Sequence, residues 1–164
     1  MKAIAIRHAN SRDAPQILSV HRASVRGAPA SFYDEDIIND WSPDPSPPER
    51  LKNLITNLET AKELALVAEA GTQIVAFGSI VPSETMLAAI YVHPDFTNQG
   101  IGQRLIYGLE SLAKEAGLTE LKMDSSLNAE HFYQSNGFEN LGRGEHKLKS
   151  GRIMACVKMR KQLT

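Results

Sequence analysis

The sequence predicts a mixed α+β fold in one domain that spans residues 1–164. Segments with the 3.6-residue apolar period of a helix alternate with short apolar or alternating segments typical of strands. They do not follow the strict β-α-β order of a doubly wound parallel sheet, which favours a mixed sheet. The composition, 42% hydrophobic and 23% charged among 164 residues, is typical of a globular chain that can bury its own core.

The N-terminal part predicts one strand and two helices. Residues 2–8 alternate enough for a first strand. Asp13 offers an N-cap oxygen, Pro15 suits the first turn of a helix, and Gly27 is expected to end that helix. A second, short helix is expected over residues 34–41.

Residues 42–50 contain four of the eight prolines and therefore cannot form regular structure. A linker between two domains is one interpretation of this segment. Too little chain precedes it for a separate core, so we expect a surface loop. Apolar residues at helical spacing resume over residues 50–58, which predicts a third helix.

The centre of the chain predicts a strand followed by a long helix. Residues 87–92 are almost wholly apolar, as expected of a strand covered on both faces, and Pro94 ends them. A helix is expected from Gly100 to Ala116, with Gly117 as its C-cap. Further strands are expected over residues 64–68, 73–81, 120–124, 138–141 and 152–159, and a further helix over residues 126–136.

Charge and cysteine content narrow the classes of partner. The formal net charge is −1 and no block of Lys or Arg occurs, so we expect neither nucleic acid nor a membrane surface as partner. Cys156 is the only cysteine, which excludes intramolecular disulfides and Cys-rich zinc sites. We expect no metal, a core position for Cys156 rather than a nucleophilic role, and a cytoplasmic location. Neither a signal peptide nor a transmembrane segment is expected.

The turn between the strand and the long helix is the most informative segment. Gly100 and Gly102 present no Cβ, and the helix that begins there has free N–H groups at its start, which can bind phosphate. A P-loop would have Lys after its second glycine, where Gln103 stands, and a dinucleotide fingerprint would have a third glycine at Leu105. Close packing of the helix on the strand is the alternative explanation of the glycines.

Two segments resemble motifs of the GNAT-type N-acetyltransferases. Residues 97–102, Thr-Asn-Gln-Gly-Ile-Gly, resemble motif A, Arg/Gln-x-x-Gly-x-Gly/Ala, which cradles the pyrophosphate of acetyl-CoA. Thr97 stands where the family has Arg or Gln. Residues 125–142 are similar to motif B, and the matching positions are Asn128, Ala129, Phe132, Tyr133, Gly137 and Phe138. The resemblance covers the chain from about residue 64 onward.

The resemblance implies a mixed, mostly antiparallel sheet flanked by helices, with a splayed central strand pair that forms the acyl-CoA cleft. It implies an enzyme that uses acetyl-CoA as co-substrate and transfers the acetyl group to a primary amine by direct attack in a ternary complex. The acceptor is expected to be a small molecule or a peptide, and a homodimer is compatible with the sequence. A non-catalytic acyl-CoA sensor and a nucleotide-binding protein of another class are the alternatives.

By the same resemblance, Tyr133 is the general acid that protonates the CoA thiolate, since a phenol with a pKa of about 10 is a suitable donor. The backbone of residues 90–92 is expected to meet the pantetheine arm, and the Val92 amide to polarise the thioester carbonyl. The residues expected to bind the cofactor are Ile90, Tyr91, Val92, Asn98, Gln99, Gly100, Ile101, Gly102, Gln103 and Asn128.

The acceptor site and the general base are less defined. Tyr33 and Trp41 match a pattern found in a subgroup of bacterial acetyltransferases, so they are expected to wall the acceptor site, together with His21. No acid lies within residues 87–92, and proton loss through ordered water is the default. The other candidates for the base are Glu84, Asp34, Glu35, Asp36, His93 and His131.

Overall fold

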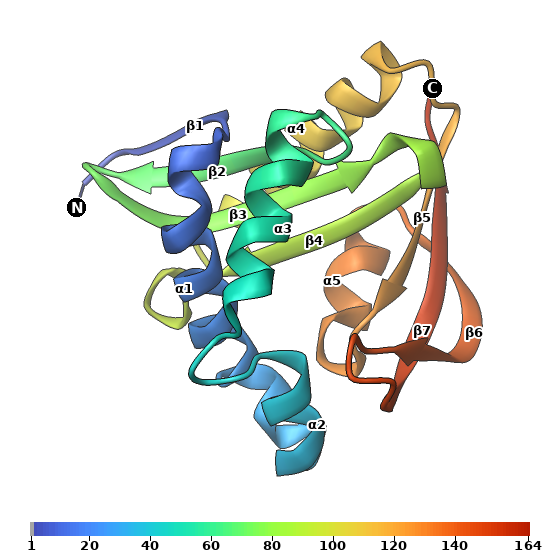
Figure 1. Ribbon diagram of the computed structural model, residues 1–164. Helices are drawn as coiled ribbons and strands as arrows, with labels where there is room; N and C mark the ends of the chain where they lie inside the picture. The colour runs from blue at the N-terminus through green and yellow to red at the C-terminus, as the bar shows by residue number, and fades with distance from the viewer. Residues whose placement is uncertain (1) are drawn as a thin grey trace.

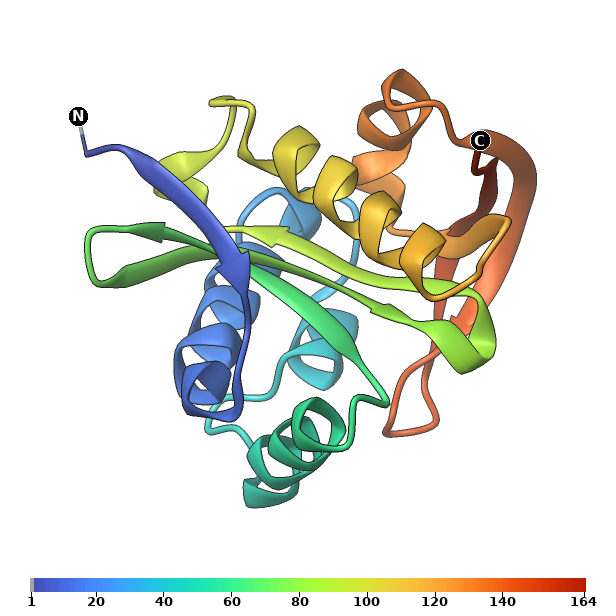
Figure 2. The same ribbon diagram turned by 90° about the horizontal axis from the view of Figure 1, so that it is seen from above.

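The computed structural model describes residues 2–164, which form one seven-stranded sheet with strand order β1-β2-β3-β4-β5-β7-β6. Only the β4–β5 pair is parallel, and the other neighbours are antiparallel. Helices cover both faces of the sheet (Figures 1 and 2). The mixed, mostly antiparallel sheet flanked by helices is therefore confirmed.

The elements follow the expected order. The strands are β1 Ile4–His8, β2 Leu64–Ala70, β3 Gln73–Val81, β4 Met86–Val92, β5 Glu120–Ser125, β6 Glu139–Lys147 and β7 Ile153–Gln162. The helices are α1 Ala14–Val25, α2 Glu35–Trp41, α3 Pro48–Glu59, α4 Ile101–Glu115 and α5 Glu130–Ser135. Short 3₁₀ turns include η2 Ala28–Ser31, η4 Pro94–Phe96 and η5 Leu127–Ala129.

Several boundaries differ from the expected ones. β2 continues to Ala70, so only Gly71 and Thr72 remain in the turn to β3, and Gly71 has the positive φ (66°) that such a turn requires. The helix expected over residues 126–136 is divided into η5 and α5. β6 and β7 are longer than expected because they pair with each other along most of their length, which the local pattern does not reveal.

The parallel pair β4–β5 is splayed. Met86 and Lys122 are the one pair in register, and the Lys122 N–H donates to the Thr85 carbonyl at 2.9 Å. Beyond that point the two strands diverge, as Figure 1 shows. β4 was expected to be covered on both faces, yet Leu87 is its one fully buried residue because the edge toward β5 is open. The splayed pair implied by the family resemblance is present.

The two faces of the sheet have different roles. α4 packs on one face, here called the α4 face, where Gly108 allows close approach: a Cβ there would lie 2.5 Å from Leu66 Cδ1. α1 and α3 cover the opposite, α1 face (Figure 2). Cys156 is 1% exposed, as expected of a core residue. Within residues 2–164, none of the helices combines the length and apolar character that a bilayer span requires.

Candidate active site

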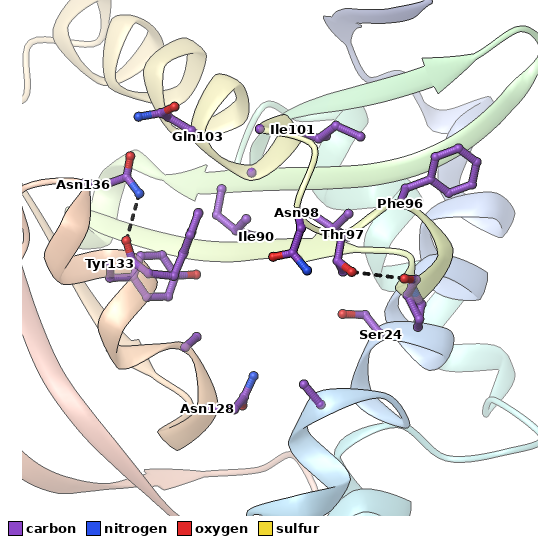
Figure 3. Close-up of a pocket in the computed structure, with 17 residues that line it drawn as sticks. Ser24, Ile90, Phe96, Thr97, Asn98, Ile101, Gln103, Asn128, Tyr133 and Asn136 are labelled. Carbon is purple, nitrogen blue, oxygen red and sulfur yellow. Dashed lines mark hydrogen bonds between the residues drawn. The ribbon is translucent and has the colours of Figure 1, made fainter. Parts of the chain in front are cut away.

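A cavity of about 660 Å³, a volume usual for small-molecule sites, opens where β4 and β5 separate (Figure 3). Its walls come from the end of β4, the loop that leads into α4, the η5–α5 segment and the C-terminal end of α1. The lining residues are Ser24, Ala28, Ile90, Val92, Pro94, Phe96, Thr97, Asn98, Gly100, Ile101, Gly102, Gln103, Asn128, Ala129, Phe132, Tyr133 and Asn136.

The loop before α4 is curved by two residues with positive φ, Asn98 (61°) and Gly100 (77°). The Arg104 N–H donates to the Gly100 carbonyl at 3.1 Å and so makes the first bond of the helix. The N–H groups of residues 101–103 therefore have no partner within the helix. A Cβ on Gly100 would have no protein atom within 4 Å, so the space beside its Cα is open. This end of the cavity suits a pyrophosphate, because the free N–H groups and the helix dipole both favour anions.

β4 presents free backbone groups to the cavity. The His93 N–H donates to the Val75 carbonyl at 2.8 Å, which makes His93 and Val75 a hydrogen-bonded pair of the ladder with β3. Because such pairs alternate along antiparallel strands, the backbone groups of Ile90 and Val92 point away from β3. β5 has already diverged there, so these groups have no strand partner. They are available to the amide-bearing arm of a pantetheine.

The α4 and α5 walls are held together by a glycine and an aromatic ring. A Cβ on Gly102 would lie 2.9 Å from Cζ of Phe132. The ring therefore occupies space that any other residue at position 102 would fill. Close packing, the alternative explanation of the glycines, applies to Gly102, while the open space at Gly100 leaves room for a ligand.

Two asparagine oxygens lie buried in the cavity wall without a hydrogen-bond partner among the described residues. They are Oδ1 of Asn128, in η5, and Oδ1 of Asn136, which follows α5. In Figure 3, Asn128 and Asn98 lie on opposite sides of the same open space. Buried oxygens without partners are costly, so they indicate that a ligand with N–H or O–H groups completes the wall. The donor-rich pantetheine arm of acetyl-CoA fits this requirement.

Tyr133 is the titratable side chain that faces the cavity from α5. It is 6% exposed and packs edge-to-face against Phe132 (5.1 Å between centroids) and Phe138 (5.7 Å). Burial raises the pKa of its phenol well above the usual value, with a smaller contribution from Tyr91. The phenol therefore stays protonated at neutral pH and is able to donate a proton.

Two of the expected cofactor residues place their side chains elsewhere. Gln99 is absent from the lining of this cavity and instead lines a second, smaller hollow of about 330 Å³ together with Lys2 and Gln73. Tyr91 points to the α1 face, where it stacks on Phe77, and burial raises its pKa to about 12. The contributions of Gln99 and Tyr91 to a ligand in the cavity would come from their backbone.

The residues expected at the acceptor site form one aromatic cluster on the α1 face. The ring of Tyr91 contacts those of His21 (4.6 Å between centroids) and Trp41 (6.2 Å), and Trp41 contacts Tyr33 (5.9 Å). None of His21, Tyr33 and Trp41 lines the described cavity. The cluster therefore lies on the face of the sheet opposite to α4, beside β4.

Burial decides the protonation state of His21. Desolvation lowers its pKa to about 3, assisted by the positive charges of Arg50 and Lys149. The ring is therefore neutral at physiological pH, and its Nδ1 lies 3.2 Å from Ser42 Oγ.

The carboxylates considered as general base lie outside the cavity. Asp34 caps α2 by accepting from the Ile37 N–H at 3.0 Å, and Glu84 lies in the turn before β4, at the opposite end of that strand from Val92. One ring nitrogen of His93 is already used within the fold, since Nδ1 accepts a hydrogen bond from the Asp95 N–H at 3.1 Å. None of Asp34, Glu35, Asp36, Glu84, His93 and His131 lines the cavity.

Sequence reasoning missed three groups of lining residues. Ser24 and Ala28 reach the cavity because α1 and η2 pass its mouth, and no local pattern signals this. Phe96 follows Pro94 in η4 and was treated as part of the turn. Asn136 had a signal that could have been used, because it lies between the matched Tyr133 and Gly137.

The comparison with protein families identifies the chain. Residues 30–163 match the model of the acetyltransferase (GNAT) domain. A spermidine N(1)-acetyltransferase from Thermoplasma acidophilum is 27% identical over 144 residues, which cover 84% of this chain and 89% of the relative. The chain therefore belongs to the GNAT acetyltransferase family, and it is an enzyme that transfers acetyl groups from acetyl-CoA to nitrogen.

Solved structures agree with the fold. A GCN5-related N-acetyltransferase from Rhodopseudomonas palustris superposes with a TM-score of 0.86 at 26% identity and covers 99% of this chain and 98% of its own. The PaiA N-acetyltransferase from Thermoplasma acidophilum, solved in complex with coenzyme A, gives 0.78 at 24% identity, covering 98% of this chain and 99% of its own. The likeness extends over the whole chain, including the N-terminal part that matched the family motifs least.

Proposed function

We propose that this protein acetylates a primary amine by direct transfer from acetyl-CoA, with Tyr133 as the proton donor to the departing thiolate. The observation that carries the proposal is the meeting of three groups in one cavity. These are the free N–H groups at the start of α4, the unpaired β4 groups of Ile90 and Val92, and the protonated phenol of Tyr133.

These groups divide the work of acetyl transfer between them. The N–H groups of residues 101–103 hold the pyrophosphate, and the free amides of β4 with Asn128 hold the pantetheine arm. The Val92 N–H polarises the thioester carbonyl, so that the oxygen is stabilised as it gains charge during attack. Tyr133 then gives its proton to sulfur. Cys156, in β7, is buried and does not line the cavity, so it is not available as a nucleophile. This supports transfer without a covalent acyl-enzyme.

We propose a small-molecule amine as acceptor, ahead of a peptide N-terminus. The related protein from Thermoplasma acidophilum carries the name spermidine N(1)-acetyltransferase, which supports a small diffusible amine. The free, buried Cys156 supports a reducing, cytoplasmic location.

The test is a thiol-release assay with acetyl-CoA and a panel of polyamines, aminoglycosides, amino acids and peptide N-termini. Amine-dependent release of CoA, with the acetylated amine detected by mass spectrometry, is the expected result. Tight binding of acetyl-CoA in calorimetry without turnover on any amine would contradict the proposal and favour a non-catalytic acyl-CoA sensor.

A further inference from the structure

The C-terminal end of α1 lies against the turn that leads into α4. A Cβ on Gly27, which follows α1, would lie 3.2 Å from Cγ of Pro94 and 3.3 Å from the carbonyl oxygen of Ser24, so α1 and η4 are in close contact there. Ser24 and Pro94 both line the large cavity. The last turn of α1 therefore forms part of the cavity wall, next to the segment to which we assign the pyrophosphate.

Within the described chain, Ser24 is the one residue of α1 that lines this cavity. A serine in a helix can donate its hydroxyl to the carbonyl four residues earlier, as Ser111 and Ser135 do in this protein. The hydroxyl of Ser24 has no hydrogen-bond partner among the described residues. Figure 3 shows it directed to the open space of the cavity, on the side where Thr97 and Asn98 lie. It is thus free to donate to a ligand.

The turn itself supplies fewer side-chain donors than the family motif implies. Thr97 stands where motif A has Arg or Gln, and its Oγ1 donates to the Pro94 carbonyl at 3.2 Å. The proton of that hydroxyl therefore closes the turn and is not available to a phosphate. No Arg or Lys is among the described residues that line the cavity. Hydrogen bonds to a charged phosphate are stronger than those between neutral groups, so a single hydroxyl on the facing wall contributes measurably.

The end of a helix also presents carbonyl oxygens, which disfavour an anion. The last carbonyls of α1 are occupied within the chain. The carbonyl of Ser24 accepts from the Gly27 N–H at 3.1 Å, and that of Arg22 accepts from the Arg26 N–H at 3.2 Å. The hydroxyl of Ser24 is therefore the group through which this wall can meet an anion favourably.

We propose that Ser24 is a binding residue for acetyl-CoA, and that its hydroxyl donates a hydrogen bond to a phosphate oxygen at the pyrophosphate end of the cofactor. The inference rests on the acetyl-CoA site of the proposed function. It adds a contact from α1, which precedes the part of the chain that the motif resemblance covers. The cofactor is then held between two walls, with the turn and the start of α4 on one side and the last turn of α1 on the other.

The decisive variant is Ser24→Ala, which removes the hydroxyl with little effect on the fold because alanine is the most favourable helix residue. We expect its Kd for acetyl-CoA, measured by calorimetry, to rise roughly tenfold, as for the loss of one hydrogen bond to a charged group. S-acetylpantetheine carries the thioester arm without either phosphate, so wild type and variant should bind it equally. Ser19→Ala, at an exposed serine of the same helix, is the matched control and should bind both ligands as the wild type does.

The outcomes decide this inference separately from the proposed function. An unchanged acetyl-CoA affinity in Ser24→Ala would overturn it. Equal losses of affinity for acetyl-CoA and S-acetylpantetheine would also overturn it, because the hydroxyl would then contact the arm. A raised KM for the amine with unchanged acetyl-CoA affinity would assign Ser24 to the acceptor, against the inference. If the wild type binds acetyl-CoA but acetylates no amine, the proposed function fails, and a tenfold loss of affinity in Ser24→Ala would still support the phosphate contact.

Discussion

The hydroxyl of Tyr33 receives a hydrogen bond from the Leu127 N–H at 2.9 Å and donates one to the Ala155 carbonyl at 2.6 Å. Leu127 begins η5, and the next residue is Asn128, whose unpartnered oxygen lies in the cavity wall. Tyr33 thus ties the N-terminal segment to the turn that positions Asn128. The hydroxyl is fully used within the fold, so a contact between Tyr33 and an acceptor would come from its ring.

Replacing Tyr33 by Phe tests the two hydrogen bonds of this hydroxyl. The ring is kept, but the buried N–H of Leu127 and carbonyl of Ala155 lose their partner, so we expect unfolding to become about 1–3 kcal/mol more favourable. Acetyl-CoA affinity is expected to fall as well, because η5 is less well held. Chemical denaturation and calorimetry measure the two effects. Wild-type stability in Tyr33→Phe would show that the two bonds contribute nothing.

Gly100→Val tests the phosphate-binding turn, with Gly117→Val as its matched control. Both glycines have positive φ, 77° and 83°, both lie at ends of α4, and at both a Cβ would have no protein atom within 4 Å. The backbone strain is therefore similar, about 1–2 kcal/mol in each variant. Only the side chain at position 100 enters the cavity.

We expect Gly100→Val to weaken acetyl-CoA binding roughly ten- to a hundredfold, because displacing one charge-assisted hydrogen bond costs about 1.5–3 kcal/mol. Gly117→Val should bind acetyl-CoA as the wild type does. Calorimetric titration of both variants gives the comparison. Equal affinities in the two variants would remove the turn from the binding site.

His21 predicts a loss of stability in mild acid. Its pKa is about 3 in the folded protein, because burial disfavours the charged ring, and about 6.5 in the unfolded chain. The unfolded state therefore binds the proton more readily, and stability is lost as pH falls from 6.5 toward 3. The loss at pH 4.5 amounts to roughly 2–3 kcal/mol relative to neutral pH.

Denaturation midpoints of the wild type and His21→Gln between pH 7 and pH 4.5 measure this slope. The variant is expected to have a flatter pH dependence, whatever its absolute stability. The buried carboxylates do not interfere in this range, because Arg7 chiefly holds the pKa of Asp13 low and Asp124 also titrates below its usual pKa. An identical slope in the variant would mean that His21 does not determine the acid sensitivity.

Local chemistry made the central helix predictable. Gly100 and Gly117 marked the ends of α4 within one residue, because glycines with positive φ stand at both ends. The matched positions from Asn128 to Phe138 placed Tyr133 at the cavity, since the motif is continuous along the chain. The cavity thus brings together most of the residues expected to bind the cofactor.

What sequence reasoning could not supply depends on long-range pairing. The two bonds of Tyr33 span 94 and 122 residues, and the pair Asp124–His146 forms across two strand registers. No periodicity or spacing indicates such contacts. Gln99 shows the same for a motif position, because a motif names the residue but not the hollow that it lines, which here is the second one.

The most direct test of the proposed acetyl-transfer mechanism is the turnover of Tyr133→Phe at saturating acetyl-CoA, with Tyr107→Phe, an exposed tyrosine on α4, as control. The ring at position 133 stays packed, so acetyl-CoA affinity should remain within about twofold of wild type, while kcat falls by about a hundredfold or more because the thiolate loses its proton donor. Tyr107→Phe should turn over as the wild type does. A Tyr133→Phe enzyme with wild-type kcat would contradict the assignment of Tyr133 as the general acid.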